Sequence, residues 1–92
     1  MERITLSNKI AWQILPNKEF VYVCNLKTRQ YYQFDDSAMK MWLSIANNEP
    51  ISRENLVKIV ADYYEIEEIE IKEDVDEFLN SLYQEGLIVI NE

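Results

Sequence analysis

The chain has 92 residues, of which 48% are hydrophobic, and a formal net charge of −8 from 17 Asp or Glu and nine Lys or Arg. This length suits one domain over residues 1–92 with a single modest core. The acidic balance argues against a nucleic-acid partner, because phosphate binding depends on Lys and Arg. It favours a basic peptide or the basic patch of a larger protein.

The sequence contains no histidine, and Cys24 is its single cysteine. One cysteine cannot form an internal disulfide, which favours a reducing compartment. The residues beside Cys24 offer no basic group to activate its thiol, so we interpret it as a small, half-buried strand residue. The first ten residues lack the apolar core of a signal peptide, and no apolar run reaches transmembrane length. We therefore expect a cytoplasmic protein with no membrane partner.

Three strands are predicted in the first third of the chain, at residues 10–15, 19–26 and 29–34. The turn signal Pro-Asn-Lys at residues 16–18 separates the first two. The connection at residues 27–28 is also short. Short connections favour neighbouring antiparallel strands, so we expect a three-stranded meander.

Three helices are predicted to follow the strands. Asp35 or Asp36 can cap the first one, its carboxylate accepting hydrogen bonds from the free backbone N–H groups. Ser52 is the expected cap of the second. Apolar residues at helical spacing predict the inner faces. For the first helix these are Ala38, Met41, Trp42, Ile45 and Ala46, and for the second Leu56, Ile59, Val60 and Tyr63.

The segment "EIEEIEIKED" is ambiguous, because its alternation resembles a strand and its charge resembles the start of a helix. We interpret it as a loop to about Ile69, followed by a third helix with acidic residues in its first turn. Its inner stripe is Val75, Phe78, Leu79 and Leu82. Gly86 is the expected left-handed end of this helix, and "LIVI" after it forms a short strand or extension.

Catalytic motifs are absent from the sequence. Without histidine and with one cysteine there is no Cys/His dyad, Ser-His-Asp triad or tetrahedral zinc set. No glycine-rich phosphate loop occurs, because Gly86 is the only glycine. Capping explains the Asp35-Asp36 pair better than acid–base chemistry does. The sequence therefore predicts a protein that is not an enzyme and needs no cofactor or metal.

A DNA-binding winged helix is an alternative for three helices beside a small sheet. Residues 70–85 hold six acids and one lysine, which would sit poorly against phosphates.

Peptide binding is the function that these patterns favour. A meander has two edges, and an exposed edge can pair with a further strand. Natural edges are commonly protected by Lys or Pro, and "QYYQF" contains neither. An extended peptide could pair with this strand by β-augmentation. The predicted binding residues of the strand are Arg29, Gln30, Tyr31, Tyr32, Gln33 and Phe34, although Tyr32 and Phe34 are also candidates for the core.

The third helix offers a second wall for such a groove. One flank of its inner stripe carries Lys72, Asp76, Leu79 and Tyr83, which complete the predicted peptide-binding set. Tyr83 combines an apolar ring with a polar tip, which suits a half-wet groove. The sequence alone leaves open which flank of this helix faces the strand.

The order and spacing of three segments resemble the PqqD-like family. They are "NLKTRQYYQFDDSAMKMWLSI", "ISRENLVKIVADYY" and "EDVDEFLNSLYQEGLI". Its members are small recognition elements for the leader peptides of ribosomally synthesised, post-translationally modified peptides. The resemblance implies an α+β fold of the winged helix-turn-helix type, with a three-stranded antiparallel sheet followed by three helices. It also implies a non-catalytic protein whose leader peptide joins the third strand as a fourth.

Within that family the hairpin "VYVCNLKTRQYYQFDDSAMKMW" is more similar to the lasso-peptide leader-binding type. It departs from the usual pattern at Arg29, where many members carry Gly, and at Asp35-Asp36, where Asn is common. The implied partners are a precursor leader peptide and a leader peptidase or modifying enzyme. A chaperone of a pyrroloquinoline quinone or other radical-SAM pathway, or a scaffold subunit of an enzyme, are the alternatives.

Overall fold

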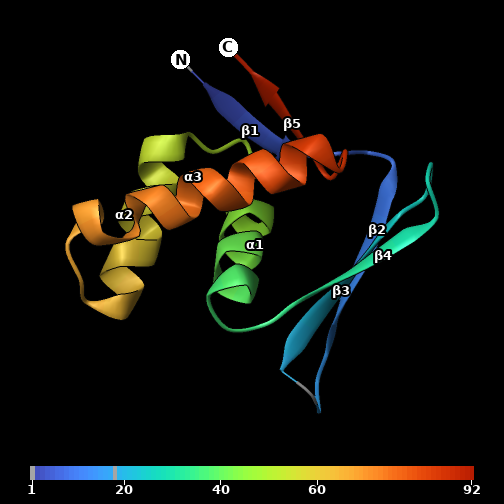
Figure 1. Ribbon diagram of the computed structural model, residues 1–92, viewed down its shortest axis with the longest axis horizontal. Helices are drawn as coiled ribbons and strands as arrows, with labels where there is room; N and C mark the ends of the chain where they lie inside the picture. The colour runs from blue at the N-terminus through green and yellow to red at the C-terminus, as the bar shows by residue number, and fades with distance from the viewer. Residues whose placement is uncertain (1, 18) are drawn as a thin grey trace.

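The computed structural model describes residues 2–17 and 19–92, and Figure 1 shows its course. In these residues five strands and three helices follow in the order β1 (Arg3–Leu6), β2 (Ile10–Leu15), β3 (Phe20–Asn25), β4 (Gln30–Phe34), α1 (Asp36–Asn48), α2 (Arg53–Tyr64), α3 (Glu68–Gln84) and β5 (Ile88–Asn91). The architecture is α+β.

Strands β2, β3 and β4 form the predicted antiparallel meander, in that order. Each lies within one residue of its predicted bounds. Val23 of β3 faces Trp12 of β2 and Tyr32 of β4. Alternate residues of β3 point to opposite faces, so Val21 and Val23 are fully buried against the helices. Arg29 belongs to the β3–β4 turn, with φ of 64°, and not to the strand. Lys18 of the predicted β2–β3 turn lies outside the described residues.

A second sheet joins the two ends of the chain. β1 pairs antiparallel with β5, so that Ile4 faces Ile90. The sequence predicts a short strand or an extension where β5 lies, and it predicts no strand where β1 lies. The predicted order of three strands and three helices therefore lacks β1. Ile4 is fully buried and also exchanges two backbone hydrogen bonds with Ile51, between α1 and α2.

Helix α1 packs beneath the meander. Its predicted inner face is confirmed, with Met41, Trp42 and Ile45 buried. The ring of Trp42 lies between those of Trp12 and Phe34, at centroid distances of 6.0 and 5.6 Å. Both strands at the edges of the meander are thereby anchored to the same core side chain.

Carboxylate capping of α1 was the wrong prediction. Asp35 occupies the N-cap position, but its side chain makes no capping hydrogen bond. Its backbone carbonyl instead accepts from the N–H of Met39 at 3.1 Å. Asp36 begins the helix with φ of 47°, a tight left-handed conformation between strand and helix. Both carboxylates are left free to face solvent at the end of β4.

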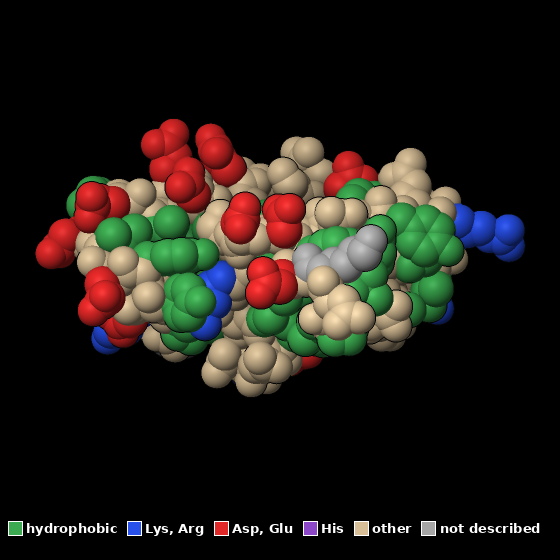
Figure 2. Space-filling model, turned by 90° about the horizontal axis from the view of Figure 1, so that it is seen from below, with side chains coloured by type: hydrophobic (Ala, Val, Ile, Leu, Met, Phe, Trp, Pro, Cys, Tyr) green, Lys and Arg blue, Asp and Glu red, His purple; other side chains and the backbone are tan. Residues whose placement is uncertain are grey.

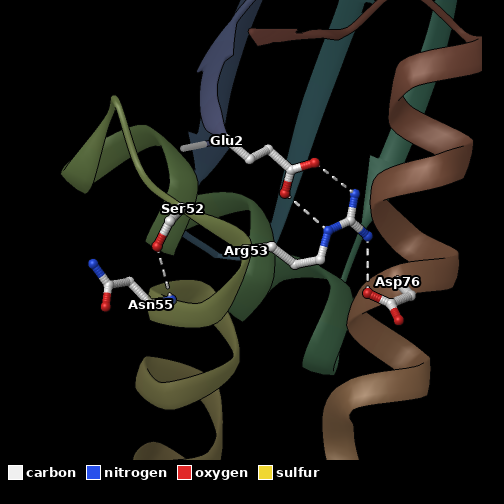
Figure 3. Close-up of polar contacts among 5 residues, drawn as sticks. All are labelled: Glu2, Ser52, Arg53, Asn55 and Asp76. Carbon is white, nitrogen blue, oxygen red and sulfur yellow. Dashed lines mark hydrogen bonds and ion pairs between the residues drawn. The ribbon is translucent and has the colours of Figure 1, made fainter. Parts of the chain in front are cut away.

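Helix α2 begins as predicted, because Ser52 Oγ accepts from the backbone N–H of Asn55 at 3.1 Å (Figure 3). Tyr63 was wrongly assigned to its inner face. The tyrosine is 60% exposed, with Lys40 Nζ 4.0 Å from its ring centroid, while Val57 and Ala61 complete the buried stripe.

Helix α3 starts at Glu68, two residues before the predicted position. Glu70 reaches back to accept from the Glu67 backbone N–H at 2.9 Å, which fixes the start of the helix. Gly86 follows its end with φ of 74°, as expected. Val75, Leu79 and Leu82 of the inner stripe are buried, and Phe78 is half-buried.

Arg53 connects the N-terminal segment to two helices (Figure 3). Its Nε donates to Glu2 Oε1 at 3.0 Å, and its Nη1 donates to Asp76 Oδ1 at 2.8 Å. The two carboxylates raise the pKa of the guanidinium above its already high value. The ion pairs of Arg53 connect α2 to Asp76 of α3 and to the N-terminal segment at Glu2.

Candidate functional site

Strand β4 forms an open edge of the meander. It pairs with β3 on one side, and within residues 2–17 and 19–92 no strand pairs with its other side. Its sequence, Gln30 to Phe34, contains no Lys or Pro that would discourage a further strand. An open, unprotected edge of this kind is a template for backbone pairing.

The hydrogen-bond alternation of the sheet identifies the groups on that edge. Leu26, directly after β3, donates its N–H to Lys9 O at 2.9 Å, toward β2. The N–H and C=O groups of successive residues in an antiparallel strand point to alternate sides. The N–H and C=O groups of Val21 and Val23 therefore point toward β4. Their register partners on β4, Phe34 and Tyr32, therefore bond inward. The peptide groups of Tyr31 and Gln33 point to the open side.

Aromatic packing attaches β4 to helix α3. The Phe34 and Phe78 rings meet edge to face, with centroids 5.2 Å apart and planes at 80°. Phe34 also touches Trp42, so one side chain of β4 contacts both α1 and α3. The edge strand is consequently held at a fixed position relative to the helix beside it.

A polar contact at the other end of β4 has the same effect. Tyr32 Oη lies 2.7 Å from Glu85 Oε2 and 2.9 Å from Gln30 Oε1. The hydroxyl has one proton, which goes to the carboxylate because charge-assisted hydrogen bonds are stronger. This bond raises the pKa of Tyr32 to about 12, with burial and the negative charge of Glu85 adding to the effect.

The side chain of Asn25 hydrogen-bonds both to the β3–β4 turn and to the residue that follows α3. Its buried side chain donates from Nδ2 to the backbone carbonyl of Glu85 at 2.8 Å. Its Oδ1 accepts from the N–H groups of Lys27 and Thr28 at 2.9 and 3.2 Å. One amide thus connects the turn before β4 to the end of α3, and Gly86 leaves room for it, since a Cβ there would lie 3.3 Å from Nδ2.

A groove between α1 and α3 begins where β4 ends. A hollow of about 240 Å³ is lined by Ser37, Ala38, Met41, Asp74, Glu77, Phe78 and Ser81. A second hollow, of about 520 Å³, shares Ser37 and Asp74 with it and continues over Asp36, Tyr64, Ile66 and Ile71. Phe78 borders the first hollow and also packs on Phe34, so the groove adjoins the open edge.

Five of the six predicted strand residues, Gln30–Phe34, form the edge strand, whereas Arg29 lies in the turn before it. Tyr31 is 75% exposed and points to the outer face of the sheet, whereas Tyr32 and Phe34 point toward the helices. The core interpretation of Tyr32 and Phe34 therefore agrees with their half-buried positions.

The predicted helix residues lie elsewhere. Leu79 is fully buried in the core, and Asp76 is bonded to Arg53 of α2. Lys72 lines a separate hollow between α2 and α3, and Tyr83 is exposed without lining the groove. The α3 residues that line the groove are Ile71, Asp74, Glu77, Phe78 and Ser81, and Glu85, directly after the helix, contacts β4.

Residues of the groove flank, such as Asp74, follow residues of the predicted flank, such as Lys72, by two positions. Two positions correspond to a rotation of roughly 200° around the helix. Both flanks carry polar residues beside the same inner stripe, so hydrophobic periodicity cannot distinguish them. The structure shows that Phe78, at the border of the stripe, marks the groove side through its contact with Phe34.

The outer face of the meander is not covered by any described helix (Figure 1). Ala11, Cys24 and Tyr31 stand opposite one another across the three strands and line a shallow hollow of about 190 Å³. Cys24 is half-buried, as expected from its place in a strand.

An open-edged meander fixed to a helix that borders a groove defines the fold of this small α+β domain. The chain belongs to the PqqD family, because residues 21–88 match the family model described as coenzyme PQQ synthesis protein D. This span includes β3, β4 and all three helices.

Two solved structures share the fold. One is described as TbiB1 in complex with the TbiA(beta) leader peptide. It is 18% identical, aligns over 91% of this chain and 93% of its own, and gives a TM-score of 0.80. The other is described as lasso peptide synthetase B1 complexed with the leader peptide, at 16% identity, coverage of 94% and 96%, and a TM-score of 0.76. No curated protein sequence matches the chain. No helix among the described residues is long and apolar enough to cross a membrane.

Proposed function

We propose that this protein is a recognition element for a ribosomally synthesised, post-translationally modified peptide, and that it captures the precursor's leader as a fourth strand on β4. The observation that carries the proposal is the open edge of β4 beside α3. Two structures of the same fold are described as leader-peptide complexes, which supports the proposal and favours a lasso-peptide pathway.

The mechanism uses the backbone for affinity and the groove for selection. Tyr31 and Gln33 together offer two N–H and two C=O groups, enough for about four hydrogen bonds at ~0.5–1.5 kcal/mol each. Two or three leader side chains buried against Phe78 and Met41 add ~1.5–3 kcal/mol apiece. An association cost of ~4–15 kcal/mol opposes them. These gains exceed the association cost only where that cost lies near the lower end of its range, so we expect a modest affinity, which suits a peptide that is released to an enzyme.

The protein performs no chemistry in this proposal. It holds the leader while a separate leader peptidase or modifying enzyme acts on the rest of the precursor. A chaperone of a pyrroloquinoline quinone or another radical-SAM pathway would use the same edge. We also propose that the fold is a variant of the winged helix, in which the groove binds a peptide and no surface binds nucleic acid.

A proline substitution gives the sharpest test. Tyr31→Pro removes an N–H that points to the open side, while the ladder to β3 uses neighbouring residues, so the sheet should survive. Ile14→Pro is the matched control, because the same alternation points the N–H of Ile14 away from β3 on the opposite edge strand. The probe is the leader segment of the precursor encoded beside this gene, titrated into isotope-labelled protein.

We expect chemical-shift changes at Gln30–Phe34 and along the groove flank of α3, lost in Tyr31→Pro and kept in Ile14→Pro. Binding that survives Tyr31→Pro would contradict strand addition on β4. Unchanged spectra up to millimolar leader would leave a scaffold subunit of a partner enzyme as the better interpretation.

A further inference from the structure

The open edge of β4 leads directly into the groove between α1 and α3. The strand ends at Phe34, and the first hollow begins at Ser37 and Phe78, which packs on Phe34. A peptide paired with β4 and extended past Phe34 would therefore continue over the groove. The question that the structure raises is what kind of side chain this part of the peptide carries.

The floor of the groove is apolar and its rim is acidic. Ala38, Met41 and Phe78 lie in the first hollow, and Tyr64, Ile66 and Ile71 in the second. The carboxylates at the rim are those of Asp36, Asp74 and Glu77, which are exposed. In the part of the chain that the structure describes, none of the three forms an ion pair, in contrast to Asp76 on the other flank of α3.

The opposite end of β4 has the opposite charge. Lys27 and Arg29 stand exposed in the β3–β4 turn, and the carboxylate of Glu85 near this end accepts a hydrogen bond from Tyr32 Oη. The same division runs through the whole chain. Residues 1–34 hold five Lys or Arg and two Asp or Glu, whereas residues 35–92 hold four and fifteen. In Figure 2 most of the visible acidic side chains lie over the helical half, and a basic side chain projects from the far end of the sheet half.

We propose that the groove selects leader peptides of one charge polarity. The segment that passes over Asp74 and Glu77 carries Lys or Arg, and the segment beside the β3–β4 turn carries Asp or Glu. The long side chain of Lys or Arg fits this groove, because its aliphatic stem can rest on Met41 and Phe78 while its charged end meets the carboxylates. For a strand antiparallel to β4, the basic residue lies N-terminal to the paired segment.

This inference rests on the proposed function, since it concerns the peptide that occupies the same edge. Its test needs no knowledge of the natural leader. Random 20-residue peptides displayed on mRNA are selected against the full chain, with free Tyr31→Pro protein present as competitor to remove peptides that bind elsewhere. Sequencing then gives the charge at each position relative to the segment that pairs with β4, which NMR locates for the best peptides.

We expect enrichment of Lys or Arg in the part that crosses the groove and of Asp or Glu in the part beside Arg29. Replacing the enriched basic residue by Glu in one selected peptide should weaken binding about tenfold at low salt, and added salt should reduce this difference. Selection against Asp74→Lys/Glu77→Lys should reverse the preference at the groove. The neutral variant Asp74→Asn/Glu77→Gln should abolish it.

Glu54→Lys/Glu68→Lys is the matched control. It makes the same change in net charge at the hollow between α2 and α3, away from the groove. An equal effect in this control would mean that total charge, and not the groove, sets the preference, which would overturn the inference. Peptides that bind β4 without any charge bias would also overturn it, and the proposed function would stand. Failure to select any peptide that β4 binds would count against both.

Discussion

Phe34 of β4 and Phe78 of α3 form an edge-to-face pair, with ring centroids 5.2 Å apart. β4 and α3 share no sheet, so side chains alone determine the spacing between the open edge and the helix beside it. Of these side-chain contacts, the Phe34–Phe78 pair is the one that borders the groove. We therefore expect it to affect both the stability of the domain and the affinity of the edge for peptide.

Phe78→Ala removes this contact. Because Phe78 is only half-buried, we expect a loss of about 2 kcal/mol in the free energy of unfolding, below the range for fully buried phenylalanines. Peptide affinity should fall about tenfold, since one wall of the groove is lost. Urea unfolding and a peptide titration measure the two effects. Tyr83→Ala, which truncates an exposed aromatic of α3 that does not line the groove, should leave affinity unchanged. Equal affinity in wild type and Phe78→Ala would exclude a role for this wall.

The Tyr32–Glu85 hydrogen bond predicts a dependence of stability on alkaline pH. The pKa of Tyr32 is about 12 in the folded protein and 10.0 for a free tyrosine. A pKa that is higher in the folded state gives stability that is complete below pH 10 and lost as pH rises toward 12. We expect Tyr32→Phe to flatten this part of the stability curve.

Selective 13C labelling of the tyrosine rings allows the titration to be followed directly by NMR. In Glu85→Gln the pKa of Tyr32 should move back toward 10, because the neutral amide accepts a weaker hydrogen bond from the hydroxyl and carries no negative charge. If the pKa of Tyr32 is the same in Glu85→Gln and in the wild type, Glu85 is not the cause of the raised pKa.

Asn25→Ala should be among the costlier single substitutions in this domain. It removes three hydrogen bonds of a buried amide and leaves the carbonyl of Glu85 without that donor, for which we expect about 2–3 kcal/mol. The β3–β4 turn should also loosen, which faster amide hydrogen exchange at Lys27 and Thr28 would report. Asn48→Ala, which removes a single side-chain bond within α1, is the control and should cost less. Unchanged exchange at the turn would mean that Asn25 does not hold it in place.

The two flanks of α3 can be separated by matched substitutions of small, exposed polar residues. Ser81→Trp places a large ring in the groove and should weaken peptide binding at least tenfold with little change in stability. Asn80→Trp places the same ring one position earlier, outside the residues that line the groove, and should leave binding unchanged. Weaker binding in Asn80→Trp and unchanged binding in Ser81→Trp would indicate that the peptide contacts the flank of Lys72, Asp76 and Tyr83.

The sequence predicted the meander and the helices because their patterns are local. Alternation fixed β2 to β4, and the 3.6-residue period fixed the inner faces of the helices, where Trp42 and Leu79 are buried as expected. The aspartate cap of α1 failed for a local reason too. Asp36 turns the chain sharply with φ of 47°, so the Asp35 carboxylate does not bond to the first turn of the helix.

Two features depended on contacts between distant residues and could not be predicted from local patterns. β1 has only four residues, and its partner β5 lies more than eighty positions further along the chain, so neither segment shows a long alternation of its own. The groove-facing flank of α3 depends on how the helix is rotated against β4. Phe78 and Glu85 fix that rotation through Phe34 and Tyr32, and these pairings are visible only in three dimensions.

The pairing of β1 with β5 places the two ends of the chain side by side, at the top of Figure 1, away from the junction of β4 and α1. A second domain could therefore be fused at either end, or the two ends joined by a short linker and the chain reopened at an exposed turn, without covering the open edge. The same module could work as a free-standing protein or as one part of a larger enzyme, with its peptide-pairing strand exposed in both settings.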